Sequence, residues 1–236
     1  LGVHIADVSH YVVSQKAIDN EAYKRGTSVY LVDRVIPMLP EVLSNGICSL
    51  NAGEDRYAMT CMMEIDTQGK VINYRIQPSI IHVNRRCSYK EIYKALTEDI
   101  IPDDLSPLMP MIHNLSDIAK TLNEMRRRRG ALDVDFPEYK VLLDTEGTPL
   151  RIVRRDRTLA ERLIEECMLI ANETVATHLK NTNRTSVYRI HETPSEEKMS
   201  MYQKVLNYLG QDIRLHLDEL EPRVFQHILD AVKGTD

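Results

Sequence analysis

The chain of 236 residues carries a formal net charge of −5, and 43% of its residues are hydrophobic. This composition is ordinary for a soluble globular protein with one large or two small domains, and no apolar run is long enough to span a bilayer. The negative charge argues against a broad nucleic-acid-binding surface, although it leaves room for a basic channel inside an acidic protein.

In the pattern of hydrophobic and turn residues, the strands come in hairpins and the helices in blocks. This favours the α+β class over a doubly wound sheet. In chain order we expect a strand at Gly2–Ala6, a helix at Gln15–Arg25, a hairpin of Tyr57–Asp66 with Val71–Val83, a short helix after Ser88, a helix at Pro110–Arg129, a hairpin of Tyr139–Asp144 with Leu150–Arg154, a helix from Thr158 to about His178, a strand at Ser186–His191, a helix ending at Gly210 and a last helix at Pro222–Val232.

Several of these helices begin or end at recognisable capping residues. Ser14 is a candidate N-cap for the first helix, and Gly26 is placed to end it. Ser88–Glu91, Thr158–Glu161 and Thr193–Glu196 each have the capping-box pattern, in which the first side chain and the fourth satisfy each other's backbone amides.

The four cysteines, at positions 48, 61, 87 and 167, are scattered without CxxC spacing. This indicates neither a zinc site nor a disulfide framework, so we expect a reduced, cytoplasmic setting. Because the chain starts at Leu1, inside a strand-like stretch, we also expect it to be a piece of a longer protein.

The stretch Ser28–Asn51 opens like a strand and then becomes irregular. Pro37, Pro40 and the turn Ser44–Gly46 interrupt both a β-ladder and a helix. The stretch is nevertheless mostly apolar, unlike a solvated loop, and it contains Tyr30. From the residues alone, Tyr30 is either a core tyrosine with a satisfied hydroxyl or a ring held out to contact a ligand.

The helix from Thr158 is apolar around most of its circumference and still carries two adjacent glutamates. At about 100° per residue, Glu166 falls close to the apolar side, whereas Glu165 shares a stripe with Arg162. Burying a carboxylate is costly unless it is paired. Two interpretations stay open for Glu165: a structural ion pair with Arg162 three residues before it, or part of a polar stripe that lines a channel.

Three residues near the start, His4, Asp7 and His10, have side chains that could bind a metal. On a strand, however, His4 and His10 share a face while Asp7 points away, so solvated or satisfied side chains are favoured over a metal site.

A group of arginines could form part of a phosphate-binding surface, or it could be a solvated face at a helix C-terminus. Its members are Arg126–Arg129, Arg151, Arg154, Arg155, Arg157 and Arg162. The chain has no Gly-rich phosphate loop, Ser-His-Asp signature or clustered catalytic carboxylates, so no catalytic residue is assigned.

Four stretches together resemble one family: LGVHIADVSHYV, RGTSVYLVDRVIPMLPEVLSNGICSLN, LIEECMLIANE and YRIHETPSEEK. They are similar to the catalytic RNB domain of the ribonuclease II group of 3′→5′ exoribonucleases. The IPMLPE, LSNG and CSLN motifs within the second stretch point to the bacterial ribonuclease R branch of this family. The resemblance covers essentially the whole chain in the expected order, so residues 1–236 are expected to be part of one RNB catalytic domain.

The resemblance implies a function for the chain and roles for three residues. Family members hydrolyse RNA processively from the 3′ end to nucleoside 5′-monophosphates, with Mg²⁺ at the bottom of a narrow channel. Tyr30 matches the tyrosine that lies against the 3′-terminal nucleotide, and Glu165 matches a glutamate that lines the channel near it. Arg162, on the same stripe, joins them as a candidate RNA-binding residue. The implied partner is the 3′ end of single-stranded RNA.

The chain also departs from the family pattern. The aspartate motif that binds Mg²⁺ should lie just before Leu1, and a downstream motif with paired arginines should lie past Asp236. The cold-shock and S1-type domains that accompany the family are missing as well. A second base-stacking aromatic is common near Ala131–Asp135, where this chain has Val134; Phe136 is the alternative.

We therefore expect a fragment of a hydrolytic exoribonuclease that is inactive by itself and contributes part of the RNA channel. The alternative is a catalytically dead relative that serves as an RNA-binding or scaffolding module.

Overall fold

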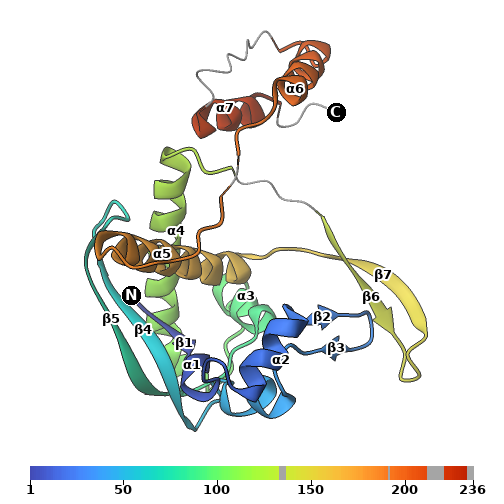
Figure 1. Cartoon of the computed structure of the whole chain (residues 1–236). Helices are drawn as coiled ribbons and strands as arrows, with labels where there is room; N and C mark the ends of the chain where they lie inside the picture. The colour runs from blue at the N-terminus through green and yellow to red at the C-terminus, as the bar shows by residue number, and fades with distance from the viewer. Residues whose placement is uncertain (133–136, 191, 212–220, 233–236) are drawn as a thin grey trace.

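The computed structural model describes residues 1–132, 137–190, 192–211 and 221–232. Its helices and antiparallel sheets confirm the α+β class (Figure 1). Within these ranges, no helix combines the length and the apolar character needed to cross a membrane.

The largest sheet has three antiparallel strands in the order β1 (Gly2–Ala6), β4 (Asp55–Ile65) and β5 (Val71–His82). The expected first strand and first hairpin are therefore confirmed. β4 and β5 pair along their whole length, with an irregularity at Ile65 beside the turn.

The buried face of β4 changes sides along the strand. Tyr57, Met59, Cys61, Met63 and Ile65 alternate along one face of the strand, and of these Cys61 and Met63 are buried and belong to the core against the helices. Tyr57, on the same face, is exposed, and in its half of the strand Ala58 and Thr60 are buried instead. A strict period of two predicts one buried face, and it fails here because each half of the strand is covered from a different side.

Helices α4 (Met109–Arg128) and α5 (Leu159–Asn181) pack against each other beside this sheet, and α3 (Tyr89–Thr97) packs on α5 (Figure 1). The buried residues between sheet and helices form one cluster: Val3, Cys61, Met63, Ala119, Leu122, Leu163, Cys167, Ile170 and Ala171. A second cluster of Ala95, Leu105, Met109 and Ile112 lies under α3, α4 and the 3₁₀ turn η2 (Ser106–Leu108).

Two of the expected capping boxes are formed. Ser88 and Glu91 satisfy each other's backbone amides at the start of α3, and Thr158 and Glu161 do the same at α5. α5 continues three residues beyond the expected end. α4 stops before Gly130, whose φ of +96° favours glycine.

The first long helix starts later than its sequence predicts. α2 spans Ala17–Arg25 with Lys16 as N-cap, so the assignment of Ser14 is wrong. Gln15 adopts a left-handed φ of +63° and donates its backbone N–H to Asp19, which separates Ser14 from the helix. Gly26 ends the helix in the left-handed conformation, as predicted.

The irregular segment after α2 contains more regular structure than expected. β2 (Val29–Tyr30) and β3 (Val35–Ile36) form a two-stranded hairpin. The expected turn Ser44–Gly46 lies inside a π-helical stretch, η1 (Val42–Ile47), at whose Gly46 the backbone is non-helical. A short helix, α1 (Val8–Tyr11), lies between β1 and α2.

The second predicted hairpin is confirmed as β6 (Glu138–Leu143) and β7 (Pro149–Arg155). It extends away from the helices, and the chain returns from β7 into α5 (Figure 1).

In the described residues after α5, the chain forms the helices α6 (Glu196–Tyr208) and α7 (Pro222–Val232), and the predicted helix cap at Thr193 is wrong. α6 begins at Ser195, not at Thr193, because the Ser195 hydroxyl accepts from the Lys198 amide. α7 matches its predicted range, and the rings of Tyr202 and Phe225 stack between the two helices.

The strand expected at Ser186–His191 is not formed over residues 186–190, and His191 lies outside the described residues. Val187 is 99% exposed and Ile190 is 81% exposed, so this apolar run is not buried against a neighbouring strand.

Arg85 joins three segments of the chain through charged hydrogen bonds. Its guanidinium donates to both carboxylate oxygens of Glu91, at 2.7 and 2.8 Å, and to both of Asp104, at 2.8 and 3.1 Å. The hydrogen bonds from Arg85 lower the pKa of both carboxyls, that of Glu91 and that of Asp104. Arg85 thereby ties the end of β5, the start of α3 and the segment before α4 together.

We predict that Arg85→Gln lowers the melting temperature at neutral pH and that the difference from the unchanged protein shrinks in acid. Carboxyls whose pKa is lower in the folded state stabilise it above their ordinary range, about pH 4, and this stabilisation is lost as the pH falls through the lowered values. Melting curves from pH 7 to pH 2 measure the effect. Lys120→Gln, which removes the exposed helical pair with Asp117, is the control with little effect. A pH-independent loss for Arg85→Gln would contradict the electrostatic explanation.

Candidate nucleic-acid interface

The hairpin from Ser28 to Ile36, here called the apolar hairpin, exposes nearly all of its large side chains. Figure 1 shows it extending from the end of α2, on the side of the molecule where β6 and β7 also extend. Its exposed apolar residues are Val29, Tyr30, Leu31, Val32, Val35 and Ile36. A contiguous exposed apolar patch of this kind marks a contact surface more often than a solvated loop.

Polar contacts fix the apolar hairpin at its base. The Ser28 hydroxyl accepts from the Met38 amide at 2.9 Å, and Arg25 donates to the Pro37 carbonyl at 3.1 Å. At the tip, the Leu31 amide donates to the Arg34 carbonyl at 2.8 Å. The first two contacts thus fix the base of the hairpin.

Tyr30 lies on this hairpin with 78% of its surface exposed. The interpretation of Tyr30 as a core tyrosine is therefore wrong, because its ring is not packed in the interior. An exposed, directed ring can stack on a nucleobase of any kind, since every base offers a π-face.

Glu165 is partly exposed on α5, with 37% of its side chain accessible, and its carboxylate pairs with Arg157. The alternative ion pair with Arg162 is wrong: among the described residues, the Arg162 side chain has no carboxylate partner. Arg157 precedes the N-cap of α5, and its side chain reaches along the first turns of the helix. Arg157 is therefore the ion-pair partner of Glu165 that helical spacing had suggested Arg162 to be. The guanidinium of Arg162, on the same stripe, keeps its donors for another acceptor.

Glu166 is only 3% exposed and has a structural environment. Its Oε1 accepts from Arg126 Nη1 at 2.7 Å and from Asn123 Nδ2 at 2.8 Å, both on α4. Its Oε2 is buried and has no hydrogen-bond partner among the residues that the structure describes. The expectation that Glu166 is more embedded than Glu165 is confirmed. Burial, followed by the charge of Glu166, also raises the pKa of the neighbouring Cys167 thiol.

The three possible metal ligands near the N-terminus have separate structural roles. His4 Nδ1 lies 2.8 Å from the Thr60 hydroxyl, and the His10 ring stacks on Tyr57 at 4.1 Å between centroids. Asp7 is the N-cap of α1. Each of the three side chains therefore has a contact of its own, as the interpretation of satisfied side chains expects.

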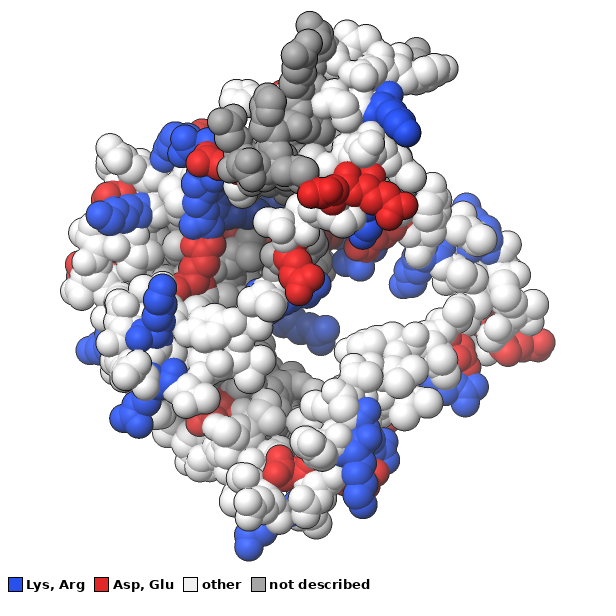
Figure 2. Space-filling view, turned by 45° about the horizontal axis from the view of Figure 1, so that its top comes forward, with Lys and Arg blue, Asp and Glu red and all other residues white. Residues whose placement is uncertain are grey.

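Most of the arginine group is paired with carboxylates. Five pairs join arginine to acid: Arg126–Glu166, Arg129–Glu173, Arg154–Asp156, Arg155–Glu138 and Arg157–Glu165. Figure 2 accordingly shows Lys and Arg side chains interspersed with Asp and Glu on the visible face, not as one continuous basic surface. The other members of the group, Arg127, Arg128, Arg151 and Arg162, have no carboxylate partner among the described residues.

The described residues offer no ligand set for Mg²⁺. Across the described ranges, no three His, Cys, Asp or Glu side chains come together in a way that could hold a metal ion. The alternative stacking positions, Val134 and Phe136, lie outside the described residues.

A model of the RNB domain matches residues 1–236. The chain belongs to the RNB domain family. Ribonuclease R of Thermotoga maritima is 46% identical over 235 residues, which are 99% of this chain and 33% of that protein. Ribonuclease R of Escherichia coli is 36% identical over 98% of this chain and 28% of its own length. The chain therefore spans about a third of the length of these curated relatives.

Solved structures give the same answer for the RNB fold. Mycoplasma genitalium RNase R in complex with double-stranded RNA superposes with a TM-score of 0.94 at 31% identity, over 99% of this chain and 42% of that one. Yeast Ssd1, described as a pseudonuclease, superposes with a TM-score of 0.74 at 17% identity over 100% of this chain and 28% of that one. At that identity Ssd1 shows a shared fold alone, and an RNB fold by itself does not establish catalysis.

We predict that replacing the two neighbouring glutamates changes the stability of the fold to very different extents. Glu166→Gln should lower the free energy of unfolding by about 2–4 kcal/mol, because it leaves Arg126 partly buried without its counter-ion. Glu165→Gln removes only a partly exposed pair and should change it by less than about 1 kcal/mol. Urea unfolding of both variants measures the difference. Equal effects would mean that Glu166 is not the structural member of the pair.

Proposed function

We propose that this chain is part of the catalytic RNB domain of a processive hydrolytic 3′→5′ exoribonuclease, and that it forms part of the channel for the 3′ end of single-stranded RNA. The parent enzyme would release nucleoside 5′-monophosphates. The match of the RNB model to the whole chain and the ribonuclease R relatives support this proposal. We also propose a cytoplasmic location, which the four free cysteines support.

The observation that carries the proposal is the exposed ring of Tyr30 on a hairpin with a fixed base. We assign Tyr30 to the base of the 3′-terminal nucleotide. Stacking needs a ring that is both accessible and directed, and this hairpin provides both. The other apolar side chains of the hairpin would exclude water from the stacked base.

Arg162 and Glu165 complete the proposed interface on α5. Arg162, without a carboxylate partner in the described chain, can donate to a phosphate oxygen. Glu165 lies on the same stripe of α5, and its carboxylate accepts from Arg157 in an ion pair. It can accept a hydrogen bond from a ribose hydroxyl if the ion pair opens, or if the carboxylate accepts from both groups at once.

The chemistry of phosphodiester hydrolysis is proposed to come from elsewhere in the parent enzyme. We propose Mg²⁺ as its cofactor, bound by aspartates that lie outside this chain, because the described carboxylates do not group into a metal site. What this chain contributes is the binding and orientation of the RNA end.

A second candidate is a catalytically inactive relative that binds RNA or acts as a scaffold. The shared fold does not decide against it, because RNase R and a protein described as a pseudonuclease both have this fold. The two candidates differ in the residues just before Leu1 of the parent protein. An intact aspartate motif there supports the exoribonuclease, and its loss supports the inactive relative.

We predict that the 236-residue chain by itself leaves RNA intact. Two-metal hydrolysis needs carboxylates that hold both ions, and the described residues lack such a group. The measurement is incubation of the purified chain with labelled single-stranded RNA and Mg²⁺, followed by gel analysis. Release of mononucleotides from a preparation free of other nucleases would refute the assignment of the metal ligands.

In the complete enzyme, we predict that Tyr30→Ala lowers kcat/KM while Tyr30→Phe and Tyr30→Trp keep most activity. Losing a stacked ring forfeits about 1–3 kcal/mol, which corresponds to a loss of several-fold to about a hundredfold. The effect should grow as the RNA shortens, because a short strand has fewer other contacts, so Tyr30→Ala should stall at longer end products. A gel time course on one single-stranded RNA compares the variants.

Melting curves of the three Tyr30 variants provide the control. Because Tyr30 is exposed, alanine should leave the melting temperature nearly unchanged. If alanine and phenylalanine have the same activity, or if alanine unfolds the protein, Tyr30 does not act by stacking.

A further inference from the structure

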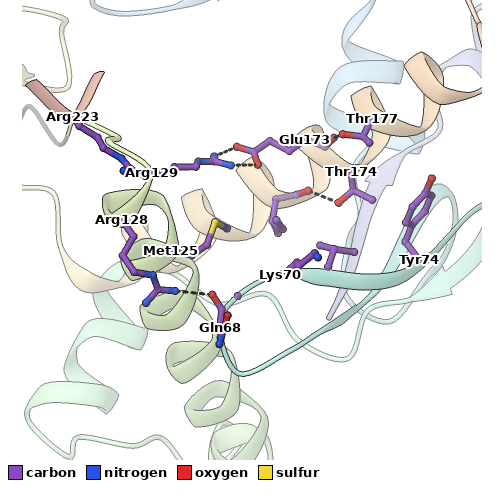
Figure 3. A pocket seen from close by; sticks show the side chains of 13 residues that line it. Gln68, Lys70, Tyr74, Met125, Arg128, Arg129, Glu173, Thr174, Thr177 and Arg223 are labelled. Atoms are coloured by element: carbon purple, nitrogen blue, oxygen red, sulfur yellow. Dashed lines mark hydrogen bonds and ion pairs between the residues drawn. The ribbon is translucent and has the colours of Figure 1, made fainter. Parts of the chain in front are cut away.

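A second candidate site lies at the opposite end of α5 from the proposed RNA interface. A pocket of about 540 Å³ opens where the β4–β5 turn, the C-terminal part of α4, the second half of α5 and the start of α7 meet (Figure 3). Thr174, in its lining, is nine residues beyond Glu165, or roughly 14 Å along the helix axis. The pocket is therefore separate from the surface that carries Arg162 and Glu165.

The wall formed by the β4–β5 turn is fixed against α4. Gly69 has a φ of +87°, and a Cβ at this position would lie 3.0 Å from the Cβ of Met125. Arg128 donates to the Gln68 carbonyl at 2.8 Å. The close approach and the hydrogen bond hold Lys70, the next residue of the turn, at the rim of the pocket.

The charges that line the pocket are mostly positive. Lys70, Arg128 and Arg223 have no carboxylate partner among the described residues. The acidic residue of the lining, Glu173, accepts from Arg129 with both of its oxygens. Within the part of the chain that the structure describes, three cations around this pocket thus have no neutralising carboxylate.

The threonine hydroxyls that line the pocket already donate to backbone carbonyls, so the cations are the donors that remain for a ligand. The Thr174 hydroxyl donates to the Ile170 carbonyl and the Thr177 hydroxyl to the Glu173 carbonyl, both at 2.7 Å. A pocket that offers charged N–H donors and few unused acceptors is complementary to an anion rich in acceptor oxygens.

The pocket also has an apolar and aromatic end. Figure 3 shows Arg128, Arg129 and Arg223 at one end, Tyr74 at the other and Lys70 between them. The Tyr74 hydroxyl lies 3.3 Å from His178 Nδ1, which fixes the direction of the ring. A ligand that fills this pocket needs a negative group at one end and a flat apolar group at the other.

We propose that this pocket binds a phosphate ester of a nucleotide, with the phosphate among Lys70, Arg128 and Arg223 and the base beside Tyr74. The volume falls within the usual range for small-ligand pockets, about 300–1,000 Å³. The site is independent of the function proposed above, because it uses none of Tyr30, Arg162 and Glu165.

Calorimetric titration with 5′-AMP, adenosine and ribose 5-phosphate tests both ends of the pocket. 5′-AMP should bind the purified protein, and adenosine should bind at least about tenfold more weakly, because a charge-assisted hydrogen bond is worth about one power of ten. Lys70→Gln and Arg223→Gln should each weaken 5′-AMP by a similar factor. Lys90→Gln, an exposed lysine on α3 outside this pocket, is the matched control and should bind like the unchanged protein.

Tyr74→Leu, which keeps an apolar side chain in the core, should weaken 5′-AMP and leave ribose 5-phosphate unchanged. Competition between 5′-AMP and an eight-nucleotide oligoadenylate, measured in EDTA, distinguishes two sources of the phosphate. If the oligoadenylate displaces 5′-AMP, the same cations also bind an RNA phosphodiester; if it does not, they bind only a free phosphate monoester. The proposal is overturned if 5′-AMP binds no better than adenosine, or if Lys70→Gln and Arg223→Gln bind like Lys90→Gln. Neither result depends on whether Tyr30 stacks on RNA.

Discussion

The buried carboxylate of Glu166 is the constraint on which the arrangement of the helices depends. A charge in the interior is tolerated only where donors meet it, and both donors, Arg126 and Asn123, come from α4. α4 and α5 can therefore approach each other only in the register that brings those two residues to Glu166. Apolar packing alone would permit several registers, since hydrophobic contact has no direction.

A second ion pair repeats this contact farther along the same interface. Arg129 and Glu173 lie three and seven residues beyond Arg126 and Glu166, that is, about one and two turns along their helices. With the register fixed at two points, the stripe that carries Glu165 faces one side of α5, and the lining of the pocket proposed for a nucleotide lies near the other end of the helix. One helix thus positions both candidate sites.

The sequence predicts best those features that local chemistry decides. The capping boxes at Ser88 and Thr158 and the range of α7 are correct, because caps, turns and helical periodicity act within a few residues. The incorrect cap assignments at Ser14 and Thr193 were also local, but other backbone groups competed: the left-handed Gln15 in one case and the better placed Ser195 in the other. The prediction of a strand at residues 186–190 is wrong. The residues have strand propensity, but a strand also needs a neighbouring strand to pair with, and propensity does not provide one.

The sites required contacts that periodicity does not encode. Helical spacing places Arg162 within reach of Glu165, yet Arg157 from outside the helix is the partner. The burial of Glu166 was foreseeable from its place on the apolar side, whereas its donors on α4, 40 and 43 residues away, were not. The pocket joins four segments distant in sequence, so no single motif could have indicated it.

The apolar hairpin is held together by only two cross-strand residue pairs, Val29–Ile36 and Tyr30–Val35. Such a short ladder contributes little stability, and the hairpin is fixed mainly through contacts at its base. Its tip can therefore tilt by small amounts while the base stays in place. In the role proposed for Tyr30, a ring mounted in this way could adjust to the different widths of purines and pyrimidines, which would let one tyrosine serve every nucleotide that reaches the end of a strand of mixed sequence.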